Sequence, residues 1–258
     1  MEISLLTFGD SFTYGEGLQF HLWKERYKDT FELYKNKKQY FPCHTIVSSV
    51  KIFDEYRIKN NYSNVLNEKL NTSLISSSQN GGSNIRNLDL LNTLIEYLET
   101  EKNVVPKYCV FQFTDVSRDF FEIQNNDYYY KIFGKEFVNN ICSLNSNLGK
   151  TSTDILDNIV TKIIDVLILK FNILETKYNC KCLYFIGLNE GKWKNNNINN
   201  SYYFPICYND ILYDSWNMLN KNNNWTLKQN IDVNDGHPCL ESHKWLANEL
   251  YNTLIINK

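Results

Sequence analysis

Hydrophobic and polar positions divide this chain into two kinds of segment, short runs bounded by turn residues and longer stretches with helical periodicity. Short runs that predict strands lie at residues 2–8, 73–78, 107–114 and 181–187. Longer stretches that predict helices lie at residues 61–71, 84–98, 154–178 and 239–255. In the second of these helices, apolar residues recur at helical spacing, and we expect Asn84 to cap its N-terminus.

The order of these elements predicts an α/β fold. Strands that alternate with helices of more than about ten residues need crossover connections, which are typical of a parallel sheet with helices on both faces. The sequence contains no long internal repeat and no linker that would separate a second hydrophobic core. Residues 18–60 are rich in aromatic and charged residues and show no clear period, so we interpret them as an insertion that roofs the candidate site.

Composition and charge mainly exclude classes of protein, such as nucleic-acid-binding and membrane-spanning proteins. The chain of 258 residues is 43% hydrophobic and 22% charged, so it can bury a substantial core as one domain. Its net charge of −2 gives no general electrostatic reason to bind nucleic acid or an anionic membrane. Since no signal-peptide pattern and no long apolar run are present, we expect an intracellular protein without a membrane span.

The cysteines do not predict a disulfide framework or a metal site. There are seven, an odd number in a chain of this length. The CKC run at residues 180–182 and the pair Cys239 and His243 could be interpreted as metal ligands. Neither has the paired spacing of a zinc site, so we expect thiols without a metal.

Residues that could bind a ligand or take part in catalysis follow the predicted strands. In a parallel α/β sheet, ligands bind at the carboxyl ends of the strands, and here those ends lead into Ser11, Gly82, Asn84, Thr114 and the segment 187–191. Most of the ten glycines lie in or next to these loops or the last loop, at positions 9, 15, 17, 81, 82, 187, 191 and 236. Turns alone hardly explain this concentration, because glycine also permits close approach of the backbone to a ligand.

The last loop, DVNDGHPCLESHKWLA at residues 232–247, carries two of the four histidines. A serine hydroxyl becomes a good nucleophile when a histidine takes its proton, and that histidine needs a carboxylate to fix its tautomer. Asp235 lies two residues before His237, so in an extended turn both side chains can point the same way, and Asp232 is a second candidate. A simple turn into the C-terminal helix would explain the same residues without catalysis.

Together, these loops resemble the sequence blocks of the SGNH (GDSL-type) serine hydrolases. FGDSFTYGEGL resembles the first block, with Gly9, Asp10 and Ser11 as the signature and Ser11 in the nucleophile position. NGGSNIR, at residues 80–86, resembles the second block, whose glycine donates a backbone N–H to the oxyanion, and Gly82 fits this role best. DGHPCLESHKWLANEL resembles the last block, in which histidine and proline lead into the C-terminal helix.

The sequence departs from the family pattern at two places. The third block usually reads Gly-x-Asn-Asp, and its asparagine donates to the oxyanion, whereas here the strand ends in QFTD with Thr114 at that position. A threonine hydroxyl can donate a hydrogen bond, so Thr114 is the expected donor. The family's aspartate usually lies three residues before the histidine, but Asn234 stands there, which makes Asp235 the expected partner. Asn84 and Gln112 are weaker candidates for substrate binding, Gln112 because strand alternation puts it on the face of Thr114.

The resemblance implies a flavodoxin-like three-layer α/β/α sandwich and an ester hydrolase that works through an acyl-enzyme. Ser11 would be the nucleophile, His237 the general base and Asp235 the residue that orients His237. The oxyanion hole would consist of the backbone N–H groups of Ser11 and Gly82 and the side chain of Thr114.

The implied substrate is a small-molecule or glycan ester, and no cofactor or metal is required. Two alternatives stay open from the sequence. An O-acyltransferase would use the same site and differ only in the nucleophile that resolves the acyl-enzyme. A binding module that retains the fold without turnover would account for the substitution at position 114.

Overall fold

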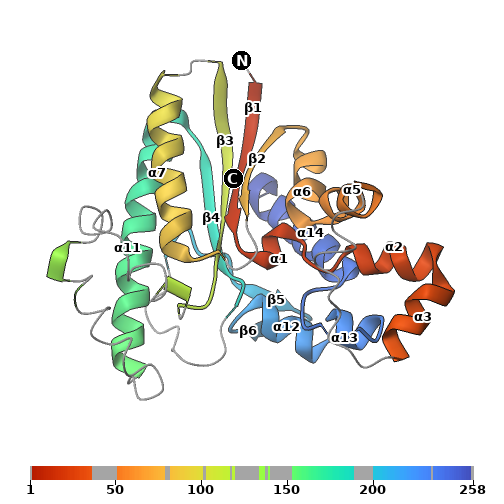
Figure 1. The fold of residues 1–258 in the computed structure, drawn as a ribbon. Coiled ribbons are helices and arrows are strands. Elements are labelled where there is room, and N and C mark those ends of the chain that lie inside the picture. The colour runs from red at the N-terminus through yellow and green to blue at the C-terminus, as the bar shows by residue number, and fades with distance from the viewer. Residues whose placement is uncertain are drawn as a thin grey trace.

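The structure is a computed structural model that describes residues 2–36, 51–78, 82–100, 103–116, 118–119, 134–136, 139, 153–188, 200–233 and 235–256. Its centre is a parallel sheet with the strand order β2-β1-β3-β4, shown in Figure 1. The strands are β1 (Glu2–Gly9), β2 (Ser73–Ser78), β3 (Val104–Phe113) and β4 (Lys181–Ile186). All four strands predicted from the sequence are therefore confirmed, and their carboxyl ends share one edge because all pairs are parallel.

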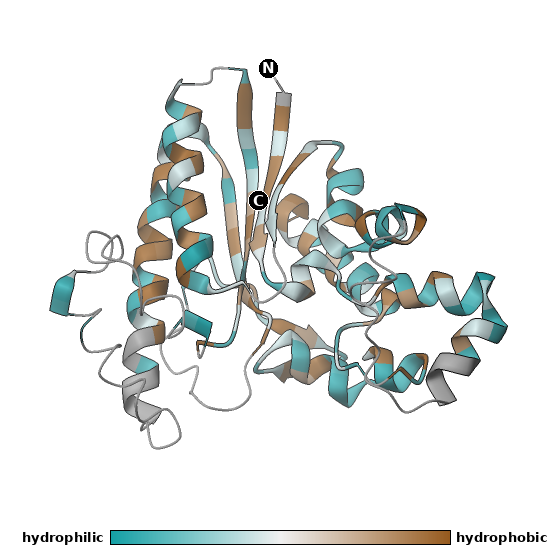
Figure 2. Cartoon of the chain, in the orientation of Figure 1, coloured by the Kyte–Doolittle hydropathy of each residue, from teal (hydrophilic) through white to brown (hydrophobic). Residues whose placement is uncertain are grey.

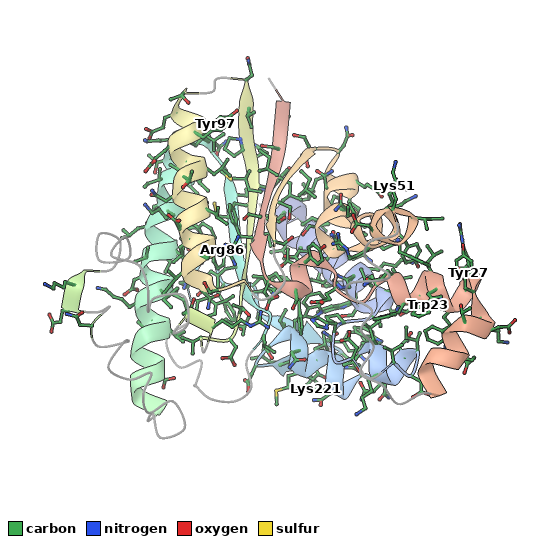
Figure 3. All side chains as sticks on the ribbon, viewed as in Figure 1. Trp23, Tyr27, Lys51, Arg86, Tyr97 and Lys221 are labelled. Atoms are coloured by element: carbon green, nitrogen blue, oxygen red, sulfur yellow. The ribbon has the colours of Figure 1, made fainter. Side chains whose placement is uncertain are left out.

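On one face of the sheet lie α7 (Asn84–Thr100) and α11 (Thr153–Tyr178), both predicted from their periodicity. Their apolar side chains form one cluster with those of β1, β3 and β4, in which Phe8 and Phe111 are 1% and 0% exposed. Figure 2 shows that the strands are largely apolar while the helices alternate between apolar and polar residues. Tyr97, labelled in Figure 3, lies on the solvent side of α7 and is 50% exposed.

On the opposite face lie α6 (Tyr62–Leu70) and α14 (Leu240–Ile256), which contact each other. Leu5 of β1 belongs to this second cluster, since neighbouring side chains of a strand point to opposite faces. Asn61 caps α6 because its side chain accepts a hydrogen bond from Asn64 N at 2.9 Å. Helices thus cover both faces of the sheet, an arrangement compatible with the expected three-layer sandwich.

Residues 18–60 differ from the aperiodic segment expected from the sequence. Their described parts form the helices α2 (Gln19–Arg26), α3 (Lys28–Asn36) and α5 (Lys51–Asn60), and residues 37–50 lie outside the described residues. In α5 the sequence shows no period because only Phe53 and Arg57 of this helix are buried. Such a helix has no continuous apolar stripe to detect.

These helices pack against the loop before α14. A third hydrophobic cluster joins Phe20, Trp23 and Phe53 of the helices to Leu227 and Cys239 of the C-terminal part of the chain. The described helices therefore pack against that loop, and the roof expected from the sequence stays a prediction. That residues 18–60 are an insertion also stays a prediction.

Smaller elements complete the fold: α1 (Ser11–Tyr14), β5 (Ile206–Tyr208), β6 (Ile211–Tyr213), α12 (Trp216–Asn222) and α13 (Leu227–Asn230). A short segment also runs parallel to the outer side of β4, where Tyr184 N donates to Tyr202 O and Phe204 N donates to Tyr184 O, each at 2.8 Å. Within the described ranges, no helix combines the length and the apolar character needed to cross a bilayer.

Candidate active site

Ser11 lies where β1 ends and the chain turns into α1. Asp10 caps this short helix, since its Oδ1 accepts a hydrogen bond from Phe12 N at 2.9 Å. Gly9 allows the turn to pack closely, because a Cβ at this position would lie 1.9 Å from Thr13 Oγ1. The turn thus fixes Ser11 as the first residue of a helix, where it is 1% exposed.

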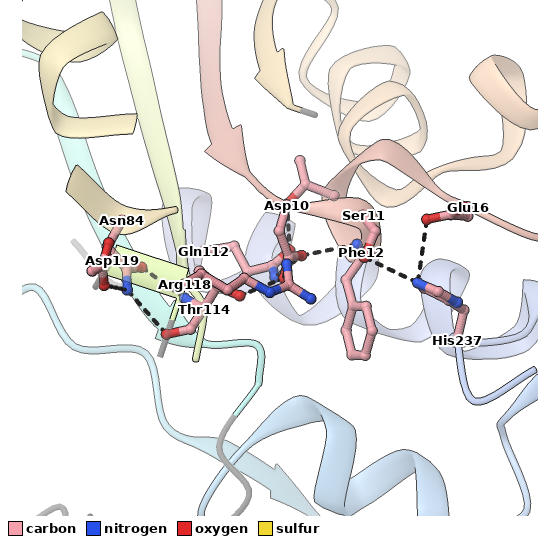
Figure 4. A network of polar contacts seen from close by, with 11 residues as sticks. Asp10, Ser11, Phe12, Glu16, Asn84, Gln112, Thr114, Arg118, Asp119 and His237 are labelled. Carbon is pink, nitrogen blue, oxygen red and sulfur yellow. Dashed lines mark hydrogen bonds and ion pairs between the residues drawn. The ribbon is translucent and has the colours of Figure 1, made fainter. Parts of the chain in front are cut away.

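His237 reaches Ser11 from a position 226 residues later in the chain. Its Nε2 lies 3.0 Å from Ser11 Oγ, and its Nδ1 lies 2.5 Å from Asp235 Oδ1 (Figure 4 shows the Ser11 contact). Asp235 Oδ1 also accepts a hydrogen bond from His237 N at 2.8 Å, so one carboxylate holds both the ring and the backbone. The structure therefore brings the three predicted residues together, and the carboxylate at Nδ1 is that of Asp235 instead of Asp232.

Backbone hydrogen bonds hold the loop of His237 in place. Leu227 N donates to His237 O at 2.9 Å, and Cys239 N donates to Trp225 O at 2.7 Å. The ring of Phe12 packs edge-on against the imidazole, with 5.3 Å between the ring centroids. Phe12, which follows Ser11, and the last loop therefore position the imidazole together.

A second carboxylate, which the sequence analysis missed, faces the imidazole. Glu16 Oε2 lies 3.5 Å from His237 Nε2, and the Glu16 side chain is 5% exposed. Gly17 beside it has a φ of +86°, and a Cβ there would lie 3.3 Å from Asp235 Oδ2. Glycine thus lets this turn fold against the His237 loop and direct Glu16 inward. The only signal in the sequence is a glutamate between two glycines, GEG, close after the nucleophile.

The charges around His237 raise its pKa. Burial alone would lower the pKa of this imidazole, because it disfavours the charged form. The hydrogen bond to Asp235 and the negative charges of Asp235, Glu16 and Asp10 outweigh burial, and the pKa of His237 lies above its ordinary value. His237 is therefore a stronger base once neutral, and it keeps its proton up to a higher pH.

Asp10 is the centre of a buried polar network beside Ser11, drawn in Figure 4. Its Oδ1 accepts hydrogen bonds from Phe12 N at 2.9 Å and Gln112 Nε2 at 2.5 Å. Its Oδ2 accepts from Thr114 Oγ1 at 2.5 Å and Arg118 Nη1 at 2.8 Å. A carboxylate that is 0% exposed needs such partners, because an unpaired buried charge is strongly unfavourable.

This network corrects two predicted roles. Thr114 has a single hydroxyl hydrogen and donates it to Asp10, so the structure does not place it as the oxyanion donor that its position suggested. Gln112 is 0% exposed and accepts a hydrogen bond from Thr13 while it donates to Asp10. It therefore lies beneath the site as support, where it cannot bind substrate.

The substrate-binding role predicted for Asn84 is corrected in the same way. Its Nδ2 donates to Thr114 O at 3.0 Å and to Asp119 Oδ2 at 2.7 Å, and its Oδ1 accepts from Thr114 N at 2.7 Å. Both amide hydrogens are therefore used within the protein, and Asn84 holds the end of β3 and does not bind substrate. Nor does it cap α7, because the cap is Ser83, whose Oγ accepts from Arg86 N at 3.2 Å.

Gly82 lies at the edge of the sheet where the oxyanion is expected. The strands β1 and β2 are in register up to the pair Gly9 and Ser78, so the loop after β2 starts beside the nucleophile turn. Residues 79–81 lie outside the described residues, and Gly82 is buried directly before the cap of α7. Its N–H as an oxyanion donor stays a prediction.

The other histidine and the cysteines considered as ligands lie in the core. His243 is 0% exposed, its Nδ1 accepts from Tyr62 N at 3.1 Å, and burial lowers its pKa to about 3. Cys180 and Cys182 are buried with their Sγ atoms 3.9 Å apart, and Cys239 is buried in the third cluster. In the parts of the chain that the structure describes, no group of three or more His, Cys, Asp or Glu residues could hold a metal ion.

Comparison of the chain with models of protein families, with curated proteins and with solved structures gave no match. The geometry itself indicates what the site can do. A hydroxyl, an imidazole and a carboxylate in hydrogen-bonded series can move a proton from the hydroxyl to the ring and so create a nucleophile. Of the groups around Ser11, the side chains of His237 and Arg118 are 22% and 27% exposed, so a substrate would meet these two first.

Proposed function

We propose that this protein is an SGNH (GDSL-type) serine hydrolase that cleaves small-molecule or glycan esters through an acyl-enzyme on Ser11. The observation that carries the proposal is the hydrogen-bonded series from Asp235 through His237 to Ser11. The strand order β2-β1-β3-β4 supports it, because flavodoxin-like sheets begin with the same order. The position of Ser11 at the carboxyl edge of that sheet is a further support, since ligands bind at this edge.

In the first half of the proposed reaction, Ser11 Oγ attacks the acyl carbon while His237 Nε2 takes the hydroxyl proton. The bond from the acyl carbon to the alcohol oxygen then breaks, and the imidazolium gives that proton to the leaving oxygen. Asp235 stays ionised, holds the Nδ1–H and stabilises the imidazolium. The products are a free alcohol and an acyl ester of Ser11.

In the second half, His237 removes a proton from water, and the water oxygen attacks the acyl carbon. Ser11 Oγ leaves, takes back a proton from the imidazolium, and the carboxylic acid is released. The backbone N–H of Ser11 is a suitable oxyanion donor in both halves, because the first N–H groups of a helix have no acceptor within the helix. An O-acyltransferase would use an alcohol in place of water and would need the same residues.

An active-site serine probe tests the proposal. A fluorophosphonate is expected to label the protein at Ser11, as located by mass spectrometry of the digested protein. Nitrophenyl esters from acetyl to long-chain acyl, together with acetylated sugars, are the substrates to screen for hydrolysis. A protein that is neither labelled nor active on any of them would be a binding module, and the proposal would be wrong.

The raised pKa of His237 predicts the pH dependence of hydrolysis. His237 acts as a base only when neutral, so kcat/KM should fall as the pH falls through a pKa that lies above the ordinary value for histidine. Glu16→Gln removes one of the negative charges that raise this pKa, so the acidic limb of the profile should move to lower pH. The measurement is kcat/KM against pH for both proteins.

The matched control is Glu68→Gln, which removes an exposed carboxylate of α6. Its profile should overlay that of the wild type, because an exposed charge away from the imidazole is screened by water and salt. An unmoved acidic limb in Glu16→Gln would mean that Glu16 does not act on the imidazole.

The hydrogen bond from Thr114 to Asp10 predicts a loss of stability for Thr114→Val. The variant leaves a buried carboxylate with one partner fewer, which should lower the free energy of unfolding by about 1–3 kcal/mol. Turnover per titrated active site should change by less than about threefold, against the ~10²–10³ expected for a lost oxyanion donor. Urea unfolding and kcat normalised to active-site titration give the two quantities.

Thr7→Val is the control, because Thr7 is equally buried in β1 but donates only to the neutral hydroxyl of Ser76, at 2.9 Å. It should lose less stability than Thr114→Val, since hydrogen bonds to charged groups contribute more. Normal stability with a large loss of turnover in Thr114→Val would instead restore Thr114 as an oxyanion donor.

A further inference from the structure

The side chains at the end of β3 do not supply an oxyanion donor. Thr114 gives its hydroxyl hydrogen to Asp10, and Asn84 uses both amide hydrogens on Thr114 and Asp119. Gln112 is fully buried beneath Asp10. Acyl transfer puts a negative charge on the carbonyl oxygen, and preorganised donors aimed at that oxygen are often the largest single contribution to catalysis.

Arg118 is a cation held beside the nucleophile turn. Its Nη1 donates to Asp10 Oδ2 at 2.8 Å, and in the described part of the chain this is the only hydrogen bond of its side chain. Among the described residues, the remaining N–H donors of the guanidinium fork have no acceptor. The Arg118 side chain is 27% exposed whereas that of Asp10 is 0% exposed, so the guanidinium lies between the buried carboxylate and solvent.

Asp10 fixes the guanidinium relative to the nucleophile. Asp10 Oδ1 accepts a hydrogen bond from Phe12 N, and Asp10 Oδ2 accepts one from Arg118 Nη1. The same carboxylate therefore binds both the turn that carries Ser11 and the guanidinium. In Figure 4 the guanidinium lies beside Asp10, between Thr114 and the turn that carries Ser11. A donor tied down in this way needs little reorganisation during the reaction.

We propose that Arg118 donates a hydrogen bond to the oxyanion of the tetrahedral intermediate, the role that the sequence suggested for Thr114. The inference rests on the proposed function, because it needs an acyl carbon attacked by Ser11. A charged donor is roughly twice as strong as a neutral one. The guanidinium also presents its N–H donors in a planar fork, so less rotamer freedom is lost for each hydrogen bond it forms.

Two variants test this role. Arg118→Ala removes the guanidinium, and Arg118→Lys keeps a positive charge for Asp10 but loses the planar fork. We expect Arg118→Ala to lower kcat by ~10²–10³ with KM changed by less than about threefold, and Arg118→Lys to lie between it and the wild type. Arg26→Ala, which removes an exposed arginine of α2, is the matched control and should leave both constants unchanged.

Two further readouts separate a donor from a structural partner of Asp10. Guanidinium ion at non-denaturing concentration should restore part of the kcat of Arg118→Ala, because it can fill the vacated space. A trifluoromethyl ketone, which forms a tetrahedral adduct with Ser11, should bind the variants more weakly by the same factor by which kcat/KM falls. If Arg118→Ala does not fold, the same kinetic comparison with the wild type is made with Arg118→Lys, which keeps the ion pair with Asp10.

Three results would overturn the inference. A lower melting temperature with unchanged kcat per titrated site and no effect of guanidinium would mean that Arg118 only neutralises Asp10. A raised KM with unchanged kcat, restricted to esters that carry a carboxylate or phosphate, would mean that Arg118 binds an anionic substrate group. A wild-type protein that neither reacts with the fluorophosphonate nor hydrolyses esters would remove the proposed function and the inference together.

Discussion

Ser11→Ala is expected to lower the kcat of ester hydrolysis by about 10⁶-fold, the effect of removing the nucleophile from a serine hydrolase site. In the proposed reaction Ser11 Oγ forms the bond to the acyl carbon, so without it no acyl-enzyme can form and His237 has no hydroxyl to deprotonate. The fold should be retained, because the only hydrogen bond of the Ser11 hydroxyl among the described residues is the one to His237. The free energy of unfolding should therefore change by less than about 1 kcal/mol.

Initial rates, fluorophosphonate labelling and thermal unfolding measure these expectations. Ser63→Ala is the matched control, because Ser63 is also buried but lies on α6, away from the imidazole. It should keep full activity and labelling. Activity retained in Ser11→Ala with a normal melting temperature would show that Ser11 is not the nucleophile.

His237→Asn is expected to lower kcat by about 10⁴–10⁶-fold, because an amide cannot take the proton of Ser11. His243→Asn should not. The ring of His243 packs edge-on against Trp216, with 5.1 Å between centroids, and stacks with Tyr62 at 6.3 Å. Its replacement should therefore lower the melting temperature and leave kcat per titrated active site close to that of the wild type.

Each histidine variant is the control for the other, since both remove an imidazole and only that of His237 forms a hydrogen bond with Ser11. The measurements are kcat normalised to active-site titration and the melting temperature of each variant. If His243→Asn lost activity while His237→Asn kept it, the general base would have been assigned to the wrong histidine.

The sheet and most of its helices could be predicted from the sequence because burial imposes a local period on the chain. The segment 73–78 forms β2 and the segment 154–178 lies within α11, as expected. The helices α2 and α5 could not be predicted in this way. Only two residues of α5 are buried, and the buried apolar residues of α2 pack against residues distant in the chain.

The hydrogen-bonded series of Asp235, His237 and Ser11 could be predicted as a set of residue types. A nucleophilic serine needs a histidine and a carboxylate, the chain has few histidines, and one of them follows an aspartate in a loop near the end of the sheet. Only the tertiary structure decided between Asp235 and Asp232. The hydrogen bond to Nδ1 depends on the loop conformation, which contacts from Leu227 to His237 hold in place.

The donors around the nucleophile were decided by tertiary structure alone. Strand alternation predicts the face on which Thr114 lies, but its acceptor, Asp10, comes from 104 residues earlier in the chain. Arg118 and Glu16 carry no periodic signal, and their roles depend on partners that only folding brings near. Local burial patterns are encoded in neighbouring residues, so the sequence by itself determined the four strands of the sheet, the helices packed on its faces and the residue types of the candidate triad. The partner of each buried polar group depends on which residues the fold brings close to it. An unpaired buried charge has a high free energy, so such a partner is needed, but no local sequence pattern shows which residue it is.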